Sequence, residues 1–376
     1  MTSLTAATAA LFDRLRPDAV PDFVEAEFVV APADAAEAAA VLAVAGESGL
    51  RVRFHGSGTH RGLGYPLDTD VAMLTQRLEG IIDYQPEDLT LVVGAGATLG
   101  EIDAVIADRR QTAVLPETTP SATVGGVVSA AISGHRRYRY GPTRDRVLEV
   151  TMASGYGQVV RAGGRVVKNV TGYDLPRLST GSFGSLGLIT SVCLKLWPVP
   201  MAQATMTVDD AEAARNLVYR PLAVLETEDG SFVYVSGTEA EVDAHARALG
   251  SAALPGLDWP KPLDEQVSLA LRVPARLTSD ALDVATDLGA ARYVAAHGVG
   301  EVTFGLDEVD VMAVEKARSW AESSGGALVV VRCPADLYER FDPWGSPPPS
   351  IELQRSVKAA FDPAGVCNPG ILPGRL

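Results

Sequence analysis

Three segments rich in glycine and small hydroxyl-bearing residues lie in the first half of the chain, each beside a stretch of strand character. The first covers 56–60 and follows an alternating stretch at 51–54. The second covers 116–134, and the third, 168–174 followed by 181–187, runs into the apolar stretch 187–196. Glycine permits tight turns and a close approach of the backbone to another group. The segments therefore predict loops at strand ends that pack closely on a neighbour or a ligand.

Apolar periodicity predicts both helices and strands around these segments. We expect a helix over 34–48 that ends at Gly49. Thr98 and Glu101 have the spacing of a capping box, which would open a helix burying Ile102, Val105 and Ile106. Strands are expected at 51–54, 71–74, 80–84, 89–93, 111–115 and 187–196, with a hairpin over 147–161.

The glycine segments stop at Pro200, after the boundary sequence 197–200. Residues 201–345 mix strands at 232–235 and 327–331 with helices at 211–217, 240–249 and 311–323, which is typical of a separate α+β domain. A proline-rich stretch at 343–349 precedes a helix at 351–361. The expected domains are 1–200, 201–345 and a C-terminal segment, 346–376.

Composition excludes several classes of protein. The chain has 376 residues and a formal net charge of -15, which disfavours nucleic acid and anionic membrane surfaces as partners. Its three cysteines are far apart and form no C-x-x-C, so a disulfide framework, a zinc site and an iron–sulfur cluster lack their spacing. No stretch reaches the ~20 apolar residues of a membrane span, and the start has no signal-peptide pattern. These features favour a cytoplasmic protein.

Each glycine segment has a plain structural explanation beside a functional one. The loop 56–60 can turn several N–H groups inward as a nest for a pyrophosphate, but taken alone an ordinary turn explains it better. The segment 118–126 is apolar enough to favour a buried loop lining a cavity over a surface loop. In the third segment, glycines at 181, 184 and 187 fit backbone packing better than a cofactor contact, and the glycosylation pattern at Asn169 is dismissed for a cytoplasmic chain.

Other candidate motifs are weaker. Residues 93–100 imitate a dinucleotide fingerprint, but Leu99 stands where the third glycine is required, and no P-loop occurs. The five histidines form no metal-binding pattern. The basic stretch 135–140 is equally compatible with a solvated turn and with binding a carboxylate, a phosphate or an acidic partner.

The three segments in this order resemble the FAD-binding domain of the vanillyl-alcohol-oxidase type, also called the PCMH type. The sequence 164–175, with Gly181-Ser182 and Leu186-Gly187, is most similar to the FAD-binding subunits of glycolate oxidases within the 2-hydroxy-acid dehydrogenase branch. The resemblance covers about 20–200 and the C-terminal Asn368-Pro369-Gly370. It implies an α+β fold, with a two-part FAD-binding domain and an α+β cap domain.

The resemblance also implies the cofactor-binding residues. The pyrophosphate would lie on the first loop, the flavin and its ribityl chain on the second segment and its continuation, with a backbone contact from β-strand residue Ile189 and an approach from the C-terminal segment. The implied residues are Gly56, Ser57, Gly58, Thr59, His60, Pro120, Ser121, Thr123, Gly125, Gly126, Ser133, Gly134, Gly141, Ile189 and Asn368.

Departures from the family limit what is implied. Thr59 occupies the position of the histidine that some members attach to the flavin, so we expect non-covalent FAD. Phe183 and Ala131 replace residues common in relatives. The His-x-Gly-Asp-Gly-Asn segment of catalytic relatives is absent, so no catalytic base or metal ligand is assigned. Arg136, Arg137 and Arg139 remain weak candidates for binding a substrate carboxylate.

The implied function is oxidation of a small 2-hydroxy acid such as glycolate, with hydride passing to the flavin. Three hypotheses stay open. The chain is an accessory flavin subunit beside a second flavin subunit and an iron–sulfur subunit; or it is a self-sufficient FAD-dependent oxidoreductase; or it is a non-catalytic scaffold. We expect a cytoplasmic chain, or one held at the inner membrane through its partners.

Overall fold

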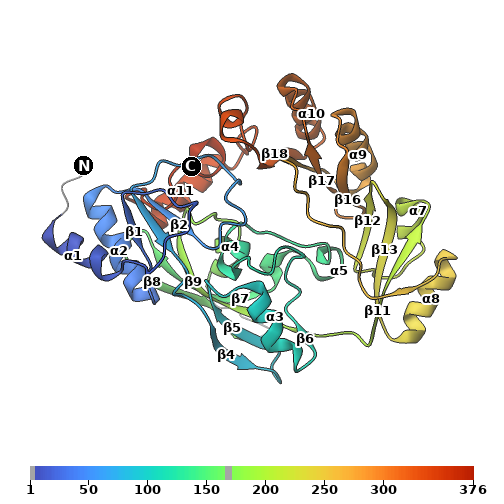
Figure 1. The fold of residues 1–376 in the computed structure, drawn as a ribbon, viewed down its shortest axis with the longest axis horizontal. Coiled ribbons are helices and arrows are strands. Elements are labelled where there is room, and N and C mark those ends of the chain that lie inside the picture. Colours follow the sequence, from blue (N-terminus) through green and yellow to red (C-terminus); the bar gives the residue numbers. More distant parts are fainter. Residues whose placement is uncertain (1–4, 166–171) are drawn as a thin grey trace.

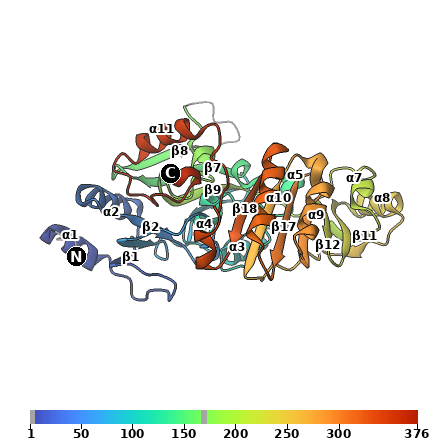
Figure 2. The same ribbon diagram turned by 90° about the horizontal axis from the view of Figure 1, so that it is seen from above.

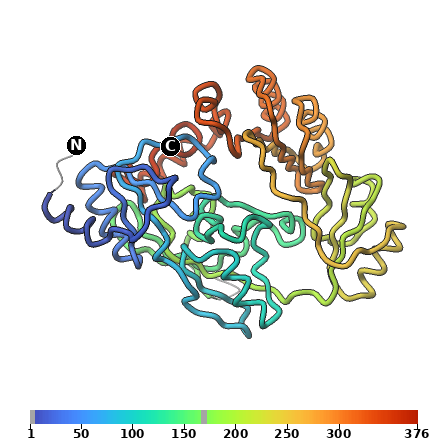
Figure 3. The backbone as a smooth tube through the Cα atoms, in the orientation of Figure 1, coloured from blue at the N-terminus to red at the C-terminus, as the bar shows by residue number. Residues whose placement is uncertain are grey.

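The computed structural model describes residues 5–165 and 172–376. It has an α+β architecture in which the N-terminal part and the cap lie at opposite ends of the long axis (Figures 1 and 2). The chain trace shows that the last residues return to the N-terminal part after the cap is complete (Figure 3). The fold class expected from the sequence is confirmed.

A small parallel sheet begins the N-terminal part. Its order is β1-β3-β2, from strands β1 (Phe28–Val30), β3 (Val71–Leu74) and β2 (Val52–His55). Helices α1 (Ala6–Arg14) and α2 (Ala35–Ser48) share a core with it. Asp34 caps α2 by accepting a hydrogen bond from Glu37 N at 2.8 Å, and Gly49 ends the helix with a φ of 66°. The predicted helix at 34–48 is therefore confirmed.

A five-stranded antiparallel sheet forms the second half of this part, in the order β4-β5-β9-β7-β8. Helices α3 (Leu99–Ala107) and α4 (Val124–Ser129) pack on one face of it. The elements are β4 (Ile81–Gln85), β5 (Thr90–Gly94), β7 (Val147–Ser154), β8 (Val159–Gly163), β9 (Gly187–Lys195), with α5 (Arg137–Tyr140), η1 (Thr143–Asp145) and α6 (Leu175–Ser179) in the connections.

An eight-stranded sheet forms the cap, in the order β14-β11-β13-β12-β16-β17-β15-β18. Its strands are β11 (Ala202–Val208), β12 (Ala223–Thr227), β13 (Gly230–Gly237), β14 (Leu254–Pro255), β15 (Val267–Arg272), β16 (Arg292–Ala296), β17 (Glu301–Leu306) and β18 (Ala327–Arg332). Helices α7 (Ala211–Arg215), α8 (Glu239–Leu249), α9 (Thr278–Asp287) and α10 (Val311–Ser323) cover one face. On the opposite face, Tyr140 of the N-terminal part packs against β12 and β13.

The connection between the parts and the C-terminal segment complete the fold. Strand β10 (Trp197–Pro198) pairs with β6 (Gln111–Thr112) just before β11 begins. Short 3-10 helices lie at η2 (Ala275–Leu277), η3 (Ala335–Glu339) and η4 (Pro373–Arg375), and α11 (Ile351–Phe361) precedes the return to the N-terminal part. No helix among the described residues is long and apolar enough to cross a membrane.

Several sequence predictions need correction. The capping box of α3 is present, but Val105 is 39% exposed and is not part of the core, because it lies on the outer face of the helix. The strand expected at 111–115 is only two residues long, since Val114 has a φ of 51° that a strand does not permit. The segment 116–134 contains α4, a helix that the sequence analysis missed.

Candidate functional site

The first glycine loop and the second small-residue segment meet in the fold. A Cβ at Gly56 would overlap the Thr123 hydroxyl and lie 3.3 Å from Thr123 Cβ. Glycine is required here because only a residue without a side chain lets the loop backbone reach Thr123. Gly58, with a φ of 79°, lies against the ring of Phe23 on the other side of the loop. The loop is therefore held between the start of the chain and α4.

The rest of the first loop presents polar groups to solvent. Ser57 and Thr59 are exposed, and the Thr59 hydroxyl lies 2.9 Å from His60 Nδ1. Burial, followed by the nearby charge of Arg53, lowers the pKa of His55 to about 4, and burial also lowers the pKa of His60. Both rings are thus neutral near pH 7 when nothing anionic lies beside them.

The second segment divides into an exposed entry and a buried helix. Pro120 and Ser121 are exposed, whereas Thr123 is buried and caps α4. A Cβ at Gly125 would lie 2.7 Å from Ala95 Cβ, so this glycine serves packing of α4 against β5. Gly126 has open space, apart from the Thr123 hydroxyl at 3.1 Å from an added Cβ.

Asn368 fastens the C-terminal segment to this region. Its Oδ1 accepts a hydrogen bond from Phe54 N at 2.9 Å, and its Nδ2 donates to Phe183 O at 2.6 Å. Its backbone N–H donates to Val52 O at 2.9 Å. Phe183 N in turn donates to Ser129 O at the end of α4 at 2.9 Å. The first loop, α4, the third glycine segment and Asn368 therefore form one continuous ring of contacts.

The remaining predicted residues form a wall next to this ring. Ser133 Oγ accepts from Thr143 N at 3.0 Å, and a Cβ at Gly134 would overlap the carboxylate of Glu117. Gly141 has a φ of 79°, a conformation that favours glycine. Ile189, in contrast, is 4% exposed and its side chain lies in the core of the five-stranded sheet.

The basic stretch 135–140 docks the cap. Arg137 pairs with Glu301 of β17 at 3.3 Å, and Arg139 Nη1 donates to Ser236 O of β13 at 3.1 Å. His135 stacks on Trp259 of the cap with ring centroids 5.5 Å apart. Arg136 pairs with Glu117 at 2.5 Å within the N-terminal part. Arg136, Arg137 and Arg139, the candidates for a substrate carboxylate, therefore each contact protein groups, and the stretch is half-buried against the cap.

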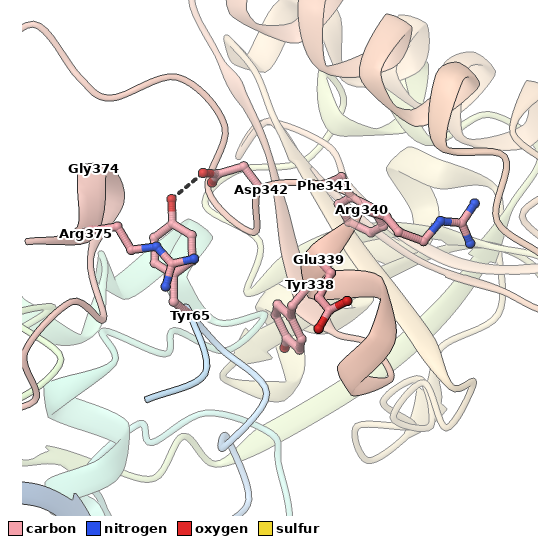
Figure 4. Close-up of a pocket in the computed structure, with 8 residues that line it drawn as sticks. All are labelled: Tyr65, Tyr338, Glu339, Arg340, Phe341, Asp342, Gly374 and Arg375. Atoms are coloured by element: carbon pink, nitrogen blue, oxygen red, sulfur yellow. Dashed lines mark hydrogen bonds between the residues drawn. The ribbon is translucent and has the colours of Figure 1, made fainter. Parts of the chain in front are cut away.

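A cavity of about 560 Å³ lies elsewhere, where the N-terminal part, the end of the cap and the C-terminal segment meet (Figure 4). Tyr65 donates a hydrogen bond to Asp342, and the Arg375 guanidinium lies 3.9 Å from the centre of the Tyr65 ring. No residue predicted for the cofactor lines this cavity. These contacts join three segments that are far apart in sequence, and the sequence analysis missed them.

Part of the third glycine segment lies outside the described residues. Residues 168–171 are not described, and Tyr173 beside them is 92% exposed. Within the described residues, no group of three His, Cys, Asp or Glu side chains is arranged to hold a metal ion.

Comparison with known families decides the identity of the N-terminal part. Residues 26–163 match the family model described as an FAD binding domain. This segment therefore has the sequence pattern of an FAD binding domain. FAD is accordingly the cofactor of this chain. The first loop fits this group, because Gly56 leaves room for a close approach to Thr123 and the side chains of Ser57 and Thr59 are exposed.

Relatives of this FAD-binding domain include oxidoreductases of hydroxy acids. The chain is 31% identical to glycolate oxidase subunit GlcE of Escherichia coli (strain K12), over 56% of this chain and 63% of that protein. It is 32% identical to glycolate oxidase subunit GlcD of Bacillus subtilis (strain 168), over 54% of this chain and 44% of that protein. It is 25% identical to D-lactate dehydrogenase of Archaeoglobus fulgidus (strain ATCC 49558 / DSM 4304 / JCM 9628 / NBRC 100126 / VC-16), over 97% and 95% respectively.

The solved structures extend the similarity of fold to the cap. An alkyldihydroxyacetonephosphate synthase superimposes on 92% of this chain with a TM-score of 0.66, covering 76% of that protein. Sequence identity in this pair is 16%, so the match establishes the arrangement of the chain and nothing about its substrate. The FAD-binding domain and the cap therefore occur together in a known fold.

Proposed function

We propose that this chain is the FAD-binding subunit of a 2-hydroxy-acid oxidoreductase, with glycolate as the first substrate to test. The similarity to two glycolate oxidase subunits, GlcE and GlcD, supports this proposal. When bound, FAD would supply an acceptor for the hydride of the α-carbon, while a base would take the hydroxyl proton, and the product would be a 2-oxo acid.

Within the proposed site, this chain holds the cofactor. The pyrophosphate would bind along Gly56–His60, and the flavin and its ribityl chain along the wall from Ser121 to Gly141. Asn368 would support the ring side from the C-terminal segment, because it already ties β2 to Phe183. Some family members attach the flavin to a histidine at the position of Thr59. Because threonine cannot form that bond, we propose that FAD is bound non-covalently.

The contacts of three arginines in the basic stretch 135–140 support the proposal of an accessory role. Arg136, Arg137 and Arg139 each contact a protein group, so none is offered to the carboxylate of a small acid. We assign no catalytic base in this chain. Substrate oxidation would therefore occur on a second flavin subunit, and an iron–sulfur subunit would pass electrons onward.

The accessory role predicts a clear division of activity. The purified chain should be yellow, and acid precipitation should release its FAD. Alone, it should reduce an artificial dye with glycolate or D-lactate at a rate near background, and activity should appear when the partner subunits are co-expressed. Dye reduction with each acid, measured with and without the partners, checks this.

One observation favours the self-sufficient alternative. The D-lactate dehydrogenase relative is matched over 95% of its length, so this chain has a counterpart for nearly all of it. Rapid turnover of D-lactate by the isolated chain would therefore replace the accessory role with that of a complete dehydrogenase. A colourless chain that takes up no added FAD would instead support a scaffold.

A further inference from the structure

Arg146 is a buried cation that the proposed function does not use. Its residue is 1% exposed, and it is among the largest fully buried side chains. Nη1 donates to Thr143 Oγ1 at 3.3 Å and Nη2 donates to Gly141 O at 2.7 Å. Nε is buried without a hydrogen-bond partner among the described residues. Its hydrogen-bond partners are all neutral, and the carboxylates of Glu117 and Asp145, which raise its pKa, form no ion pair with it.

The carboxylates near Arg146 belong to other arginines. Glu117 pairs with Arg136 at 2.5 Å, and Asp145 pairs with Arg177 at 3.0 Å. Within residues 5–165 and 172–376, no carboxylate lies within 4.0 Å of the Arg146 guanidinium. The stretches 1–4 and 166–171 contain no aspartate or glutamate. Among the described residues, Arg146 therefore has no carboxylate of its own, and a direct anionic partner would come from a ligand.

A buried cation without an anion destabilises a fold, because desolvation of the charge is not repaid. Burial, followed by the charge of Arg136, lowers the pKa of Arg146 to about 10, which still leaves it protonated at neutral pH. An apolar side chain of similar size would fill this position at lower cost. The charge is therefore better explained by a ligand than by the fold.

The position of Arg146 indicates which part of a ligand it faces. Thr143, to which it donates, gives its N–H to Ser133 Oγ at 3.0 Å and its hydroxyl to Ile132 O at 2.5 Å. Arg146 is thus linked through Thr143 to residues 132 and 133, in the segment on which we place the flavin. The pyrophosphate end of the site, where Gly56 meets Thr123, belongs to a different segment.

We propose that Arg146 is a positioning residue whose charge compensates negative charge on the flavin end of bound FAD. This inference rests on the placement of the cofactor in the proposed function. The flavin gains negative charge when it takes up two electrons and fewer than two protons. A fixed positive charge at Arg146 would then stabilise the reduced flavin more than the oxidised flavin, and this would raise the reduction potential of bound FAD.

The experiment compares charge removal with charge retention. R146M and R146Q remove the charge in two ways, and R146M also fills the space with apolar atoms. R146K retains the charge. R161Q is the matched control, because Arg161 on β8 is a surface residue that pairs with Glu149 at 2.9 Å. Each full-length protein is loaded with FAD, and the reduction potential of the flavin and the affinity for oxidised FAD are measured.

We expect R146M and R146Q to bind reduced FAD about tenfold more weakly relative to oxidised FAD than the parent does, which appears as a more negative potential. R146K should restore most of the shift, and R161Q should show none. A potential in R146M and R146Q equal to that of the parent overturns the inference, as does an equal loss of affinity for both redox forms, which would place the charge at the pyrophosphate. A parent that binds no FAD refutes the cofactor placement itself, which is a separate result.

Discussion

At the level of single residues, Gly56 is a position where even the methyl group of an alanine would disturb the proposed site. A Cβ there would overlap the Thr123 hydroxyl, and the neighbour is a buried residue at the start of α4 that has little freedom to move. The sequence predicted a tight loop here, but it did not reveal that Thr123 is the surface against which the loop is built. That contact joins residues 67 positions apart, and no local pattern encodes it.

We expect Gly56→Ala to weaken FAD binding about tenfold or more while the chain still folds, because the loop must move away from Thr123. Titration with FAD followed by flavin fluorescence measures this. Gly46→Ala is the matched control, since an added Cβ there meets Ala364 Cβ at an ordinary 3.5 Å inside α2. The control should bind FAD normally and gain up to about 1 kcal/mol of stability. Equal affinity in both variants would contradict the contact.

His55 makes stability depend on pH in a defined direction. Its folded pKa of about 4 lies below the ordinary 6.5, so the unfolded chain binds more protons between these values. The contribution of His55 to stability is complete above about pH 6.5 and is lost as the pH falls toward 4. His55→Asn should therefore reduce the loss of unfolding free energy between about pH 7 and about pH 5 by roughly 1–2 kcal/mol. Urea unfolding at both pH values checks this, and identical losses in parent and variant would refute it.

At the level of secondary-structure elements, the short helix α5 has a role that its sequence concealed. The basic stretch 135–140 was equally compatible with a ligand-binding patch and a solvated turn. In the structure its residues contact β13, β17 and Trp259 of the cap. Elements with strong local signals, such as α10 and α11, were predicted with their observed bounds. The role of the basic stretch was not predicted, because its contacts with Ser236 and Glu301 of the cap join residues 97 and 164 positions apart in sequence.

Glu301 tests the docking of α5 on the cap. Its carboxylate accepts from Arg272 Nε at 2.9 Å within the cap and from Arg137 Nη1 at 3.3 Å across the junction. We expect Glu301→Gln to weaken the junction by about 1–3 kcal/mol, because two half-buried arginines lose their anion. Protease cleavage near 198–202 should become several-fold faster. Glu228→Gln, which affects a pair with Arg292 inside the cap, should leave cleavage unchanged.

At the level of the whole molecule, the N-terminal part is completed from both ends of the sequence. The family resemblance implied its fold class and cofactor, but the cavity at Tyr65, Asp342 and Arg375 depends on three segments that meet only in three dimensions. The charge of Arg146 belongs to the same category. Its residue type is visible in the sequence, whereas its lack of an ion pair among the described residues is a property of packing.

The position of Asn368 near the end of the chain determines when its contacts can form during translation. A ribosome makes β2, α4 and the third glycine segment long before it makes Asn368, and the whole cap is translated in between. Domains made early fold while later ones are still being added. The N-terminal sheets can form on the ribosome, but the hydrogen bonds by which Asn368 links Phe54 to Phe183 form only afterwards. The C-terminal segment would therefore complete the proposed FAD site only after the cap has been translated.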